Sequence, residues 1–184
     1  MTAQQDPPGA RTPADFVVDF VNTRAGSSGR PERLGSEAAL REWAAGHGLL
    51  SSRAVVTGAD VVAARELRES LRVVLLDHAA APDLEPARVR DAERRLREAG
   101  SRNPLAAVVT AGRAEVVALA GGGPGVLAAV LAAAATAAQR GEWRLVKACS
   151  NPACGDAFTD RTRNHAGRYC APGCGSRAAS SWRP

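Results

Sequence analysis

All four cysteines of the chain lie between residues 149 and 174, and this clustering restricts the fold more than any other feature of the sequence. The spacing is C-x4-C, then fifteen residues, then C-x3-C. Two close cysteine pairs with a short spacer allow four thiolates to bind one tetrahedral zinc ion, each at about 2.3 Å. The predicted metal ligands are therefore Cys149, Cys154, Cys170 and Cys174.

The residues around each cysteine pair suit this arrangement. Pro152 and Gly155 favour a tight turn at the first pair, and Pro172 stands where a helix can begin. Such a helix would place Cys170 and Cys174 about one turn apart. We expect a hairpin followed by a helix, in a small treble-clef-like finger that depends on metal for its folding free energy.

Other uses of four cysteines agree less well with the sequence. Disulfides need an oxidising compartment, and the first sixteen residues contain no apolar run of signal-peptide length. A redox centre has a C-x2-C motif between a strand and a helix, and an iron–sulfur cluster usually has three closely spaced ligands. Because four thiolates fill the coordination shell of zinc, the one predicted ion is structural and not catalytic.

The positive charge of the chain is concentrated in the same region. The chain carries a formal net charge of +5, and the residues from Trp143 onward hold seven basic and two acidic side chains. A basic module joined to a neutral domain indicates an anionic partner, most commonly nucleic acid. The alternative is that the arginines offset the negative charge of four thiolates around zinc. The candidate DNA-contacting residues are Lys147, Arg161, Arg163, Arg168 and Arg177.

The rest of the chain has the pattern of a mostly helical domain with an aliphatic core. Apolar residues at helical spacing predict helices, and two short apolar runs around TAGR predict a β-hairpin at 104–119 with Gly112 in its turn. We therefore expect an α+β fold with a flexible tail at 1–14, a domain at 15–142 and the finger at 143–184. The predicted helices are 16–24, 36–45, 59–79, 85–99 and 125–140, and WRLVKAC at 143–149 is a predicted strand.

Four polar residues follow one another closely in the apolar segment 16–24. Buried polar groups need partners, and a ligand can supply them, so this segment is a candidate effector site. In the alternative, Asn22 and Thr23 cap the end of a helix and Asp19 pairs with an arginine. The candidate ligand-binding residues are Asp19, Asn22, Thr23 and Arg24.

Several functional classes have little support in the sequence. The longest weakly polar stretch, at 126–138, is shorter than the roughly 20 apolar residues of a membrane span. No nucleophile elbow, phosphate-binding glycine loop or H-E-x-x-H motif is present, so we expect no catalytic residues and no enzyme activity. We expect a cytoplasmic protein; an enzyme with a pocket in the first domain is the minor alternative.

The quoted motifs resemble a known family. CSNPACGDAFTDRTRNHAGRYCAPGCGSR, at 149–177, resembles the CGNR zinc finger of bacteria, with its F-x-D element, its R-aromatic-C element and a closing C-G-N-R. VDFVNTR and the helices after it look like the ABATE domain that accompanies such fingers in stress-induced transcription regulators. Ser176 departs from the pattern, because the family has Asn there, and the tail after Arg177 is not densely basic.

The resemblance implies a bacterial transcription regulator. Its zinc finger would contact DNA, and its first domain would bind an effector or a partner and set the orientation of the finger. A single finger with about four phosphate contacts binds DNA weakly, so specificity would need a homodimer or a second DNA-contacting surface. The main alternative is a protein-interaction module whose finger docks onto a partner protein.

Overall fold

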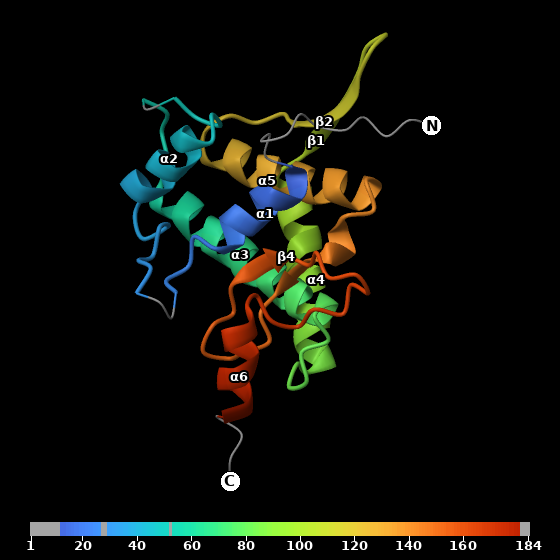
Figure 1. Cartoon of the computed structure of the whole chain (residues 1–184). Coiled ribbons are helices and arrows are strands. Elements are labelled where there is room, and N and C mark those ends of the chain that lie inside the picture. The colour runs from blue at the N-terminus through green and yellow to red at the C-terminus, as the bar shows by residue number, and fades with distance from the viewer. Residues whose placement is uncertain (1–11, 27–28, 52, 181–184) are drawn as a thin grey trace.

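The described chain consists of six α-helices, one short 3-10 helix and two antiparallel hairpins (Figure 1). The predicted mostly helical α+β class is confirmed. The helices are α1 (Pro13–Val21), α2 (Glu37–Gly46), α3 (Gly58–His78), α4 (Pro86–Arg102), α5 (Gly122–Gln139), η1 (Trp143–Leu145) and α6 (Pro172–Ser180). The strands are β1 (Leu105–Val109), β2 (Ala114–Ala118), β3 (Val146–Ala148) and β4 (Ala157–Thr159).

The computed structural model describes residues 12–26, 29–51 and 53–180, without the side chains of residues 179 and 180. Of the predicted tail, residues 1–11 lie outside this range, whereas Pro13 and Ala14 already belong to α1. The predicted strand at 143–149 is also shorter than expected. Its first three residues form η1, and pairing with β4 begins only at Val146.

Capping side chains determine where the first three helices begin. Thr12 and Asp15 form a capping box at the start of α1, and Thr57 and Asp60 form the same motif at the start of α3. The hydroxyl of Ser36 accepts a hydrogen bond from the third residue of α2. These pairs satisfy backbone N–H groups that have no partner inside the helix.

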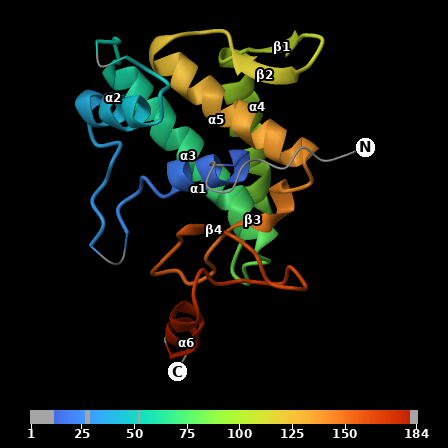
Figure 2. The same ribbon diagram turned by 45° about the horizontal axis from the view of Figure 1, so that its top comes forward.

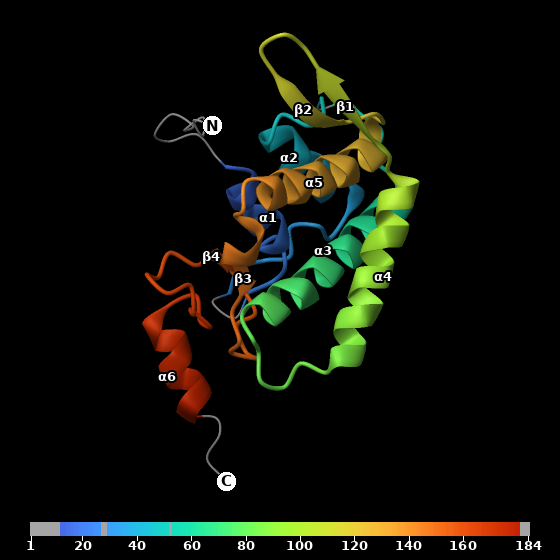
Figure 3. The ribbon, with the colours of Figure 1, turned by 90° about the vertical axis from the view of Figure 1, so that its right-hand side faces the viewer.

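The elements stack around α3 and α5. Helices α3 and α4 lie side by side as an antiparallel pair, with α1 and α5 across α3 (Figure 3). The β1–β2 hairpin packs on α5 at one end of the molecule, and α6 projects from the other end (Figure 2). Ala92 is the one buried residue of α4, so this highly charged helix lies at the surface.

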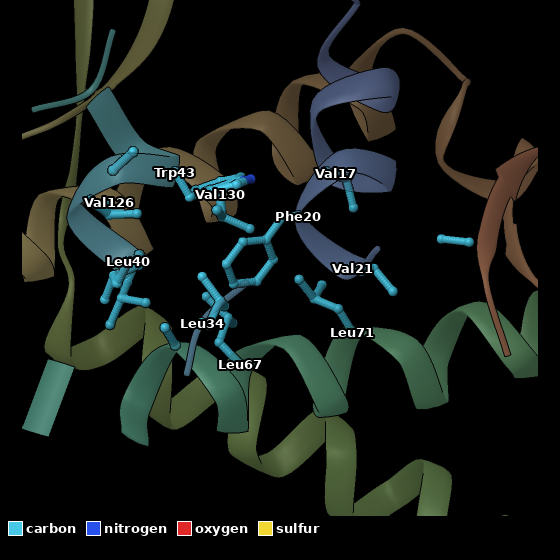
Figure 4. Packing of buried hydrophobic residues seen from close by; sticks show 14 of the residues in the cluster. Val17, Phe20, Val21, Leu34, Leu40, Trp43, Leu67, Leu71, Val126 and Val130 are labelled. Atoms are coloured by element: carbon cyan, nitrogen blue, oxygen red, sulfur yellow. The ribbon is translucent and has the colours of Figure 1, made fainter. Parts of the chain in front are cut away.

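Aromatic and aliphatic side chains from α1, α2, α3 and α5 form the core (Figure 4). Phe20 of α1 is fully buried, with its ring centroid 5.4 Å from that of Trp43 in α2. Leu71 of α3 and Val130 of α5 are buried in the same cluster. The apolar residues recur at helical spacing because each of these helices turns one face toward the same core.

The β3–β4 hairpin belongs to the same core, although it lies in the predicted finger. Val146 and Ala148 of β3 are fully buried, and Ala157 of β4 is buried beside them. β3 packs against α3, and β4 packs against α1. The first half of the finger is therefore joined to the helical part by continuous apolar packing.

Among the described residues, α5 has the length and apolar composition of a membrane-spanning helix. It is also packed by α1, β2 and α3, and it contributes Val126, Leu127 and Val130 to the core. A central helix of a globular core has the same composition, so its mean hydropathy of 1.3 is explained by its position in the fold.

Candidate metal centre

The four cysteines converge at the end of the β3–β4 hairpin. Their four Sγ atoms lie within 4.8 Å of one another. The Sγ atom of Cys170 is 3.6 Å from those of Cys154 and Cys174. Zinc–sulfur bonds of about 2.3 Å in a tetrahedron place the sulfurs about 3.8 Å apart, so the arrangement matches a four-thiolate zinc site.

The first pair of cysteines is positioned by a turn that follows β3. The backbone carbonyl of Asn151 accepts a hydrogen bond from the N–H of Cys154, and its side-chain oxygen accepts one from Ala153. Gly155 has a φ of +67°, which favours glycine over residues with a Cβ. The side-chain amide of Asn151 also donates to the carbonyl of Cys174 at 3.1 Å, and so connects the turn to α6.

The second pair lies at the start of α6, as the sequence predicts. Cys170 precedes the helix and Cys174 is in its first turn. Tyr169 packs against the cysteine cluster, and a Cβ at Gly175 would lie only 3.1 Å from the tyrosine ring. The glycine of the closing C-G-x-R motif thus allows the close contact between the aromatic ring and α6.

The environment of the cysteines favours thiols over thiolates in two positions. Burial raises the pKa of Cys154 to about 11, and burial also raises the pKa of Cys170. Cys174 differs, because hydrogen bonds from Cys170 and Arg177 outweigh its burial and lower its pKa. A divalent cation would favour the thiolate form of all four groups.

A buried ion pair supports the spacer between the two cysteine pairs. The Nζ atom of Lys147 donates to Asp160 Oδ2 at 2.7 Å and to the carbonyl of His165 at 2.6 Å. Burial alone would raise the pKa of Asp160, but hydrogen bonds from Lys147 and Thr162 hold it well below its usual range. Asp160 is the aspartate of the F-x-D element, and the motif alone does not predict its pairing with Lys147.

The position of Lys147 disagrees with its predicted contact to DNA. Its side chain is 4% exposed, and its charge is used by Asp160 inside the finger. A buried, paired ammonium group cannot reach a phosphate without breaking the ion pair. Lys147 is therefore corrected from a candidate DNA contact to a structural residue.

The other predicted DNA-contacting residues are exposed. The guanidinium groups of Arg161 and Arg163 make no hydrogen bond or ion pair with any other described residue. Arg168 donates to the carbonyl of Ala80 at 3.0 Å, which connects the spacer to the loop after α3. Arg177 donates to the Sγ atom of Cys174 at 3.2 Å.

The predicted effector residues contact the finger or the helical core. Both amide atoms of the Asn22 side chain bond to the backbone of Ala157 in β4, at 2.8 and 3.0 Å. The hydroxyl of Thr23 is buried and donates to the carbonyl of Phe20. Arg24 donates to the carbonyl of Cys154 at 3.2 Å.

These contacts argue against an effector site at this position. The polar atoms of Asn22 and Thr23 are satisfied by the chain itself, so a ligand would have to displace existing bonds. The Oδ2 atom of Asp19 lies 3.7 Å from the Nε2 atom of His47. We call Asn22, Arg24 and Arg30 the clamp, because Arg30 also contacts the finger through Asp156, at 2.6 Å.

The ion pair between Arg30 and Asp156 was not predicted from the sequence. Their positions are 126 residues apart in the chain, and neither is one of the named elements of the quoted motifs. The side chains of both are partly exposed, so their pairing has no signal in the apolar pattern.

Comparison with known families covers both parts of the chain. Residues 14–141 match the ABATE family, whose description is "putative stress-induced transcription regulator". Residues 145–182 match the CGNR zinc finger. No curated protein matches the chain. The resemblance that the motifs indicated is confirmed.

Proposed function

The chain belongs to the ABATE family, described as stress-induced transcription regulators, and from this membership we propose that it binds DNA through its C-terminal CGNR zinc finger. The observation that carries the proposal is a pair of exposed arginines without partners among the described residues, Arg161 and Arg163. They lie in the spacer between the cysteine pairs, on a loop held by the Lys147–Asp160 ion pair.

One zinc ion is the proposed cofactor. Cys149, Cys154, Cys170 and Cys174 would hold it, in keeping with sulfur atoms that lie within 4.8 Å of one another. The ion would connect the cysteine turn to α6 and supply folding free energy. Four thiolates leave no position for a water ligand, which supports a structural role and a protein without enzyme activity.

Phosphate contacts through the spacer arginines would give salt-dependent binding with little sequence preference. Each neutralised phosphate contributes about 0.9 to the slope of log affinity against log salt concentration. Arg168 of the spacer and Arg177 of α6 are also exposed and are included in the proposed surface. A single finger with so few phosphate contacts would bind DNA weakly, so we propose that a homodimer supplies further contacts. The proposed location is the bacterial cytoplasm.

The proposed role of the helical part is to orient the finger. The clamp bonds the segment directly after α1 to backbone groups of Cys154 and Ala157, so the cysteine turn cannot rotate freely against α1. The shared core between β3 and α3 supports the same conclusion. An effector that moved α3 or α4 would therefore change the position of the finger.

DNA titrations of the zinc-loaded chain test this proposal. We expect duplex DNA to bind at low salt, and the double variant R161Q/R163Q to reduce the salt slope by about 2. R90Q/R97Q is the matched control, because it removes the same charge from exposed residues of α4. Failure of the wild-type chain to bind any duplex at low ionic strength would favour the docking of a partner protein instead.

A further inference from the structure

A cavity of about 280 Å³ lies between the helical part and the cysteine turn. One wall comes from α3, the loop after it and the start of α4, and the other wall comes from residues 149–152 and Gly155. We call it the seam cavity. Its walls come from the part of the chain that matches the ABATE family and from the part that matches the CGNR zinc finger. A bound molecule would therefore contact both parts of the chain.

Arginines from the helical part surround this cavity. Arg72 of α3 and Arg88 of α4 line it. A Cβ placed on Gly155 would lie 3.1 Å from an Nη atom of Arg24 and 3.6 Å from one of Arg72, so both guanidinium groups approach the same point of the cysteine turn. Three positive side chains thus lie on or beside one small cavity.

The positive charges of the arginines around the seam cavity are only partly balanced by acidic residues. Glu69 accepts from the Nε atom of Arg72 at 2.8 Å, and the exposed Asp83 is the acidic residue of the lining. The guanidinium of Arg88 makes no hydrogen bond or ion pair with another described residue. Ser150, also in the lining, has a buried hydroxyl without a partner among the described residues. The cavity therefore has an excess of donors.

We propose that the seam cavity binds a small oxyanion, the phosphate group of a free metabolite. Guanidinium groups bind such groups through charge-assisted hydrogen bonds. The proposal rests on the proposed function, since it gives the chemical class and the location of the effector. The ligand would join Arg88 on α4 to the turn that carries Cys149 and Cys154, and would couple its own binding to the position of the finger.

Calorimetric titration of the zinc-loaded full chain tests the site. The probes are inorganic phosphate and glycerol 3-phosphate at constant ionic strength, with zinc content measured before and after. We expect saturable binding by the wild-type chain and an affinity about tenfold lower in R88Q. R90Q is the matched control, because Arg90 is exposed on the same helix outside the cavity, and it should bind like the wild type.

Two results would overturn the proposal. One is the absence of saturable binding by either probe; the other is an equal loss of affinity in R88Q and R90Q, which would show nonspecific attraction to a basic surface. A DNA arm separates the two possible sources of phosphate. If R88Q weakens duplex DNA binding as much as R161Q/R163Q does, and phosphate competes with the duplex, the cavity is part of the DNA surface and no metabolite site exists.

The same DNA arm separates this proposal from the proposed function. Saturable phosphate binding that is sensitive to R88Q, in a chain that binds no duplex, would retain the seam site and reject DNA binding. Duplex binding by a chain that shows no saturable phosphate binding would retain the proposed DNA binding and reject the seam site.

Discussion

The two halves of the finger are held in place by different forces. The β3–β4 half has strands of only three residues, yet Val146, Ala148 and Ala157 are buried in the core of the helical part. In the α6 half, Cys174 and Ala178 are the residues that the structure shows as buried. α6 extends away from the body of the molecule (Figure 1). Apolar packing thus fixes the first half, whereas the cysteine cluster fixes the second.

Removal of the metal should give the largest difference in hydrogen-exchange protection between the two halves of the finger. Because α6 is held mainly through sulfur ligands, we expect chelation, or the variant C174S, to abolish hydrogen-exchange protection in α6. Amides of β3 and β4 should keep most of their protection, since their contacts with α1 and α3 remain. Hydrogen exchange followed by mass spectrometry measures both halves in one sample.

The control for this experiment is S176A, which changes an exposed residue of α6 that is not a proposed ligand. It should leave zinc content and protection unchanged. If β3 and β4 lost protection as fully as α6 did after chelation, the finger would be a single metal-dependent unit and the difference between the halves would be wrong.

The buried ion pair of the spacer should give the next largest effect. In D160N the ammonium group of Lys147 would stay buried without its counter-charge, which typically costs about 3–5 kcal/mol of unfolding free energy. Urea unfolding of the zinc-loaded chain measures this loss. The comparison variant is D91N, which removes an exposed partner of Arg94 and Arg95 on α4 and should cost much less. Equal losses would mean that the spacer pair is no more important than a surface pair.

Truncation of the clamp should have a smaller, more local effect. N22A removes two hydrogen bonds to Ala157, at about 1 kcal/mol each, and should raise the exchange rates of β4 amides. The salt slope of DNA binding should not change, because Asn22 contacts no phosphate in the proposed surface. N164A, in the exposed part of the spacer, is the control for stability. If the β4 amides of N22A exchanged as slowly as those of the wild type, the clamp would not hold the finger and the proposed mechanism would be wrong on this point.

The order of the elements and the cysteine cluster could be predicted because their signals are local. Ser36 is a recognisable cap directly before the helix that it starts, whereas the Thr12 cap falls within the predicted tail. Pro172 and the C-x3-C spacing place the last two sulfurs at the start of one helix. Such patterns depend on neighbours in the sequence, so the chain shows them without its fold.

The roles that the sequence could not assign belong to residues whose partners only the fold brings together. Asn22 bonds to Ala157 at a separation of 135 residues, so its polarity alone could not distinguish a ligand contact from an internal one. Lys147 added to the count of positive charges, although Asp160 neutralises it in the interior. A sum of charges treats buried and exposed groups alike, and only the fold separates them.

The junction of β3 with α3 should respond to pH, with the smallest expected effect. His78 shares a 2.8 Å hydrogen bond with the carbonyl of Val146. Burial lowers the pKa of His78 below its ordinary value of 6.5, and the positive charges of Arg144 and Lys147 lower it further, against the Val146 bond and Asp77. A histidine whose pKa is lowered by folding stabilises the fold when the pH is above the pKa of the unfolded state. This contribution is lost as the pH falls below 6.5.

The measurement is the unfolding free energy of wild type and H78Q at about pH 7.5 and about pH 5.5, on either side of the unfolded pKa of histidine. The difference between the two proteins should shrink at the lower pH, because wild type alone loses the contribution of neutral His78. Protonation of the cysteines affects both chains alike and cancels in the difference. A difference that stayed constant across this range would show that His78 joins α3 to β3 equally well in both protonation states, so that the first half of the finger is held by packing independently of pH.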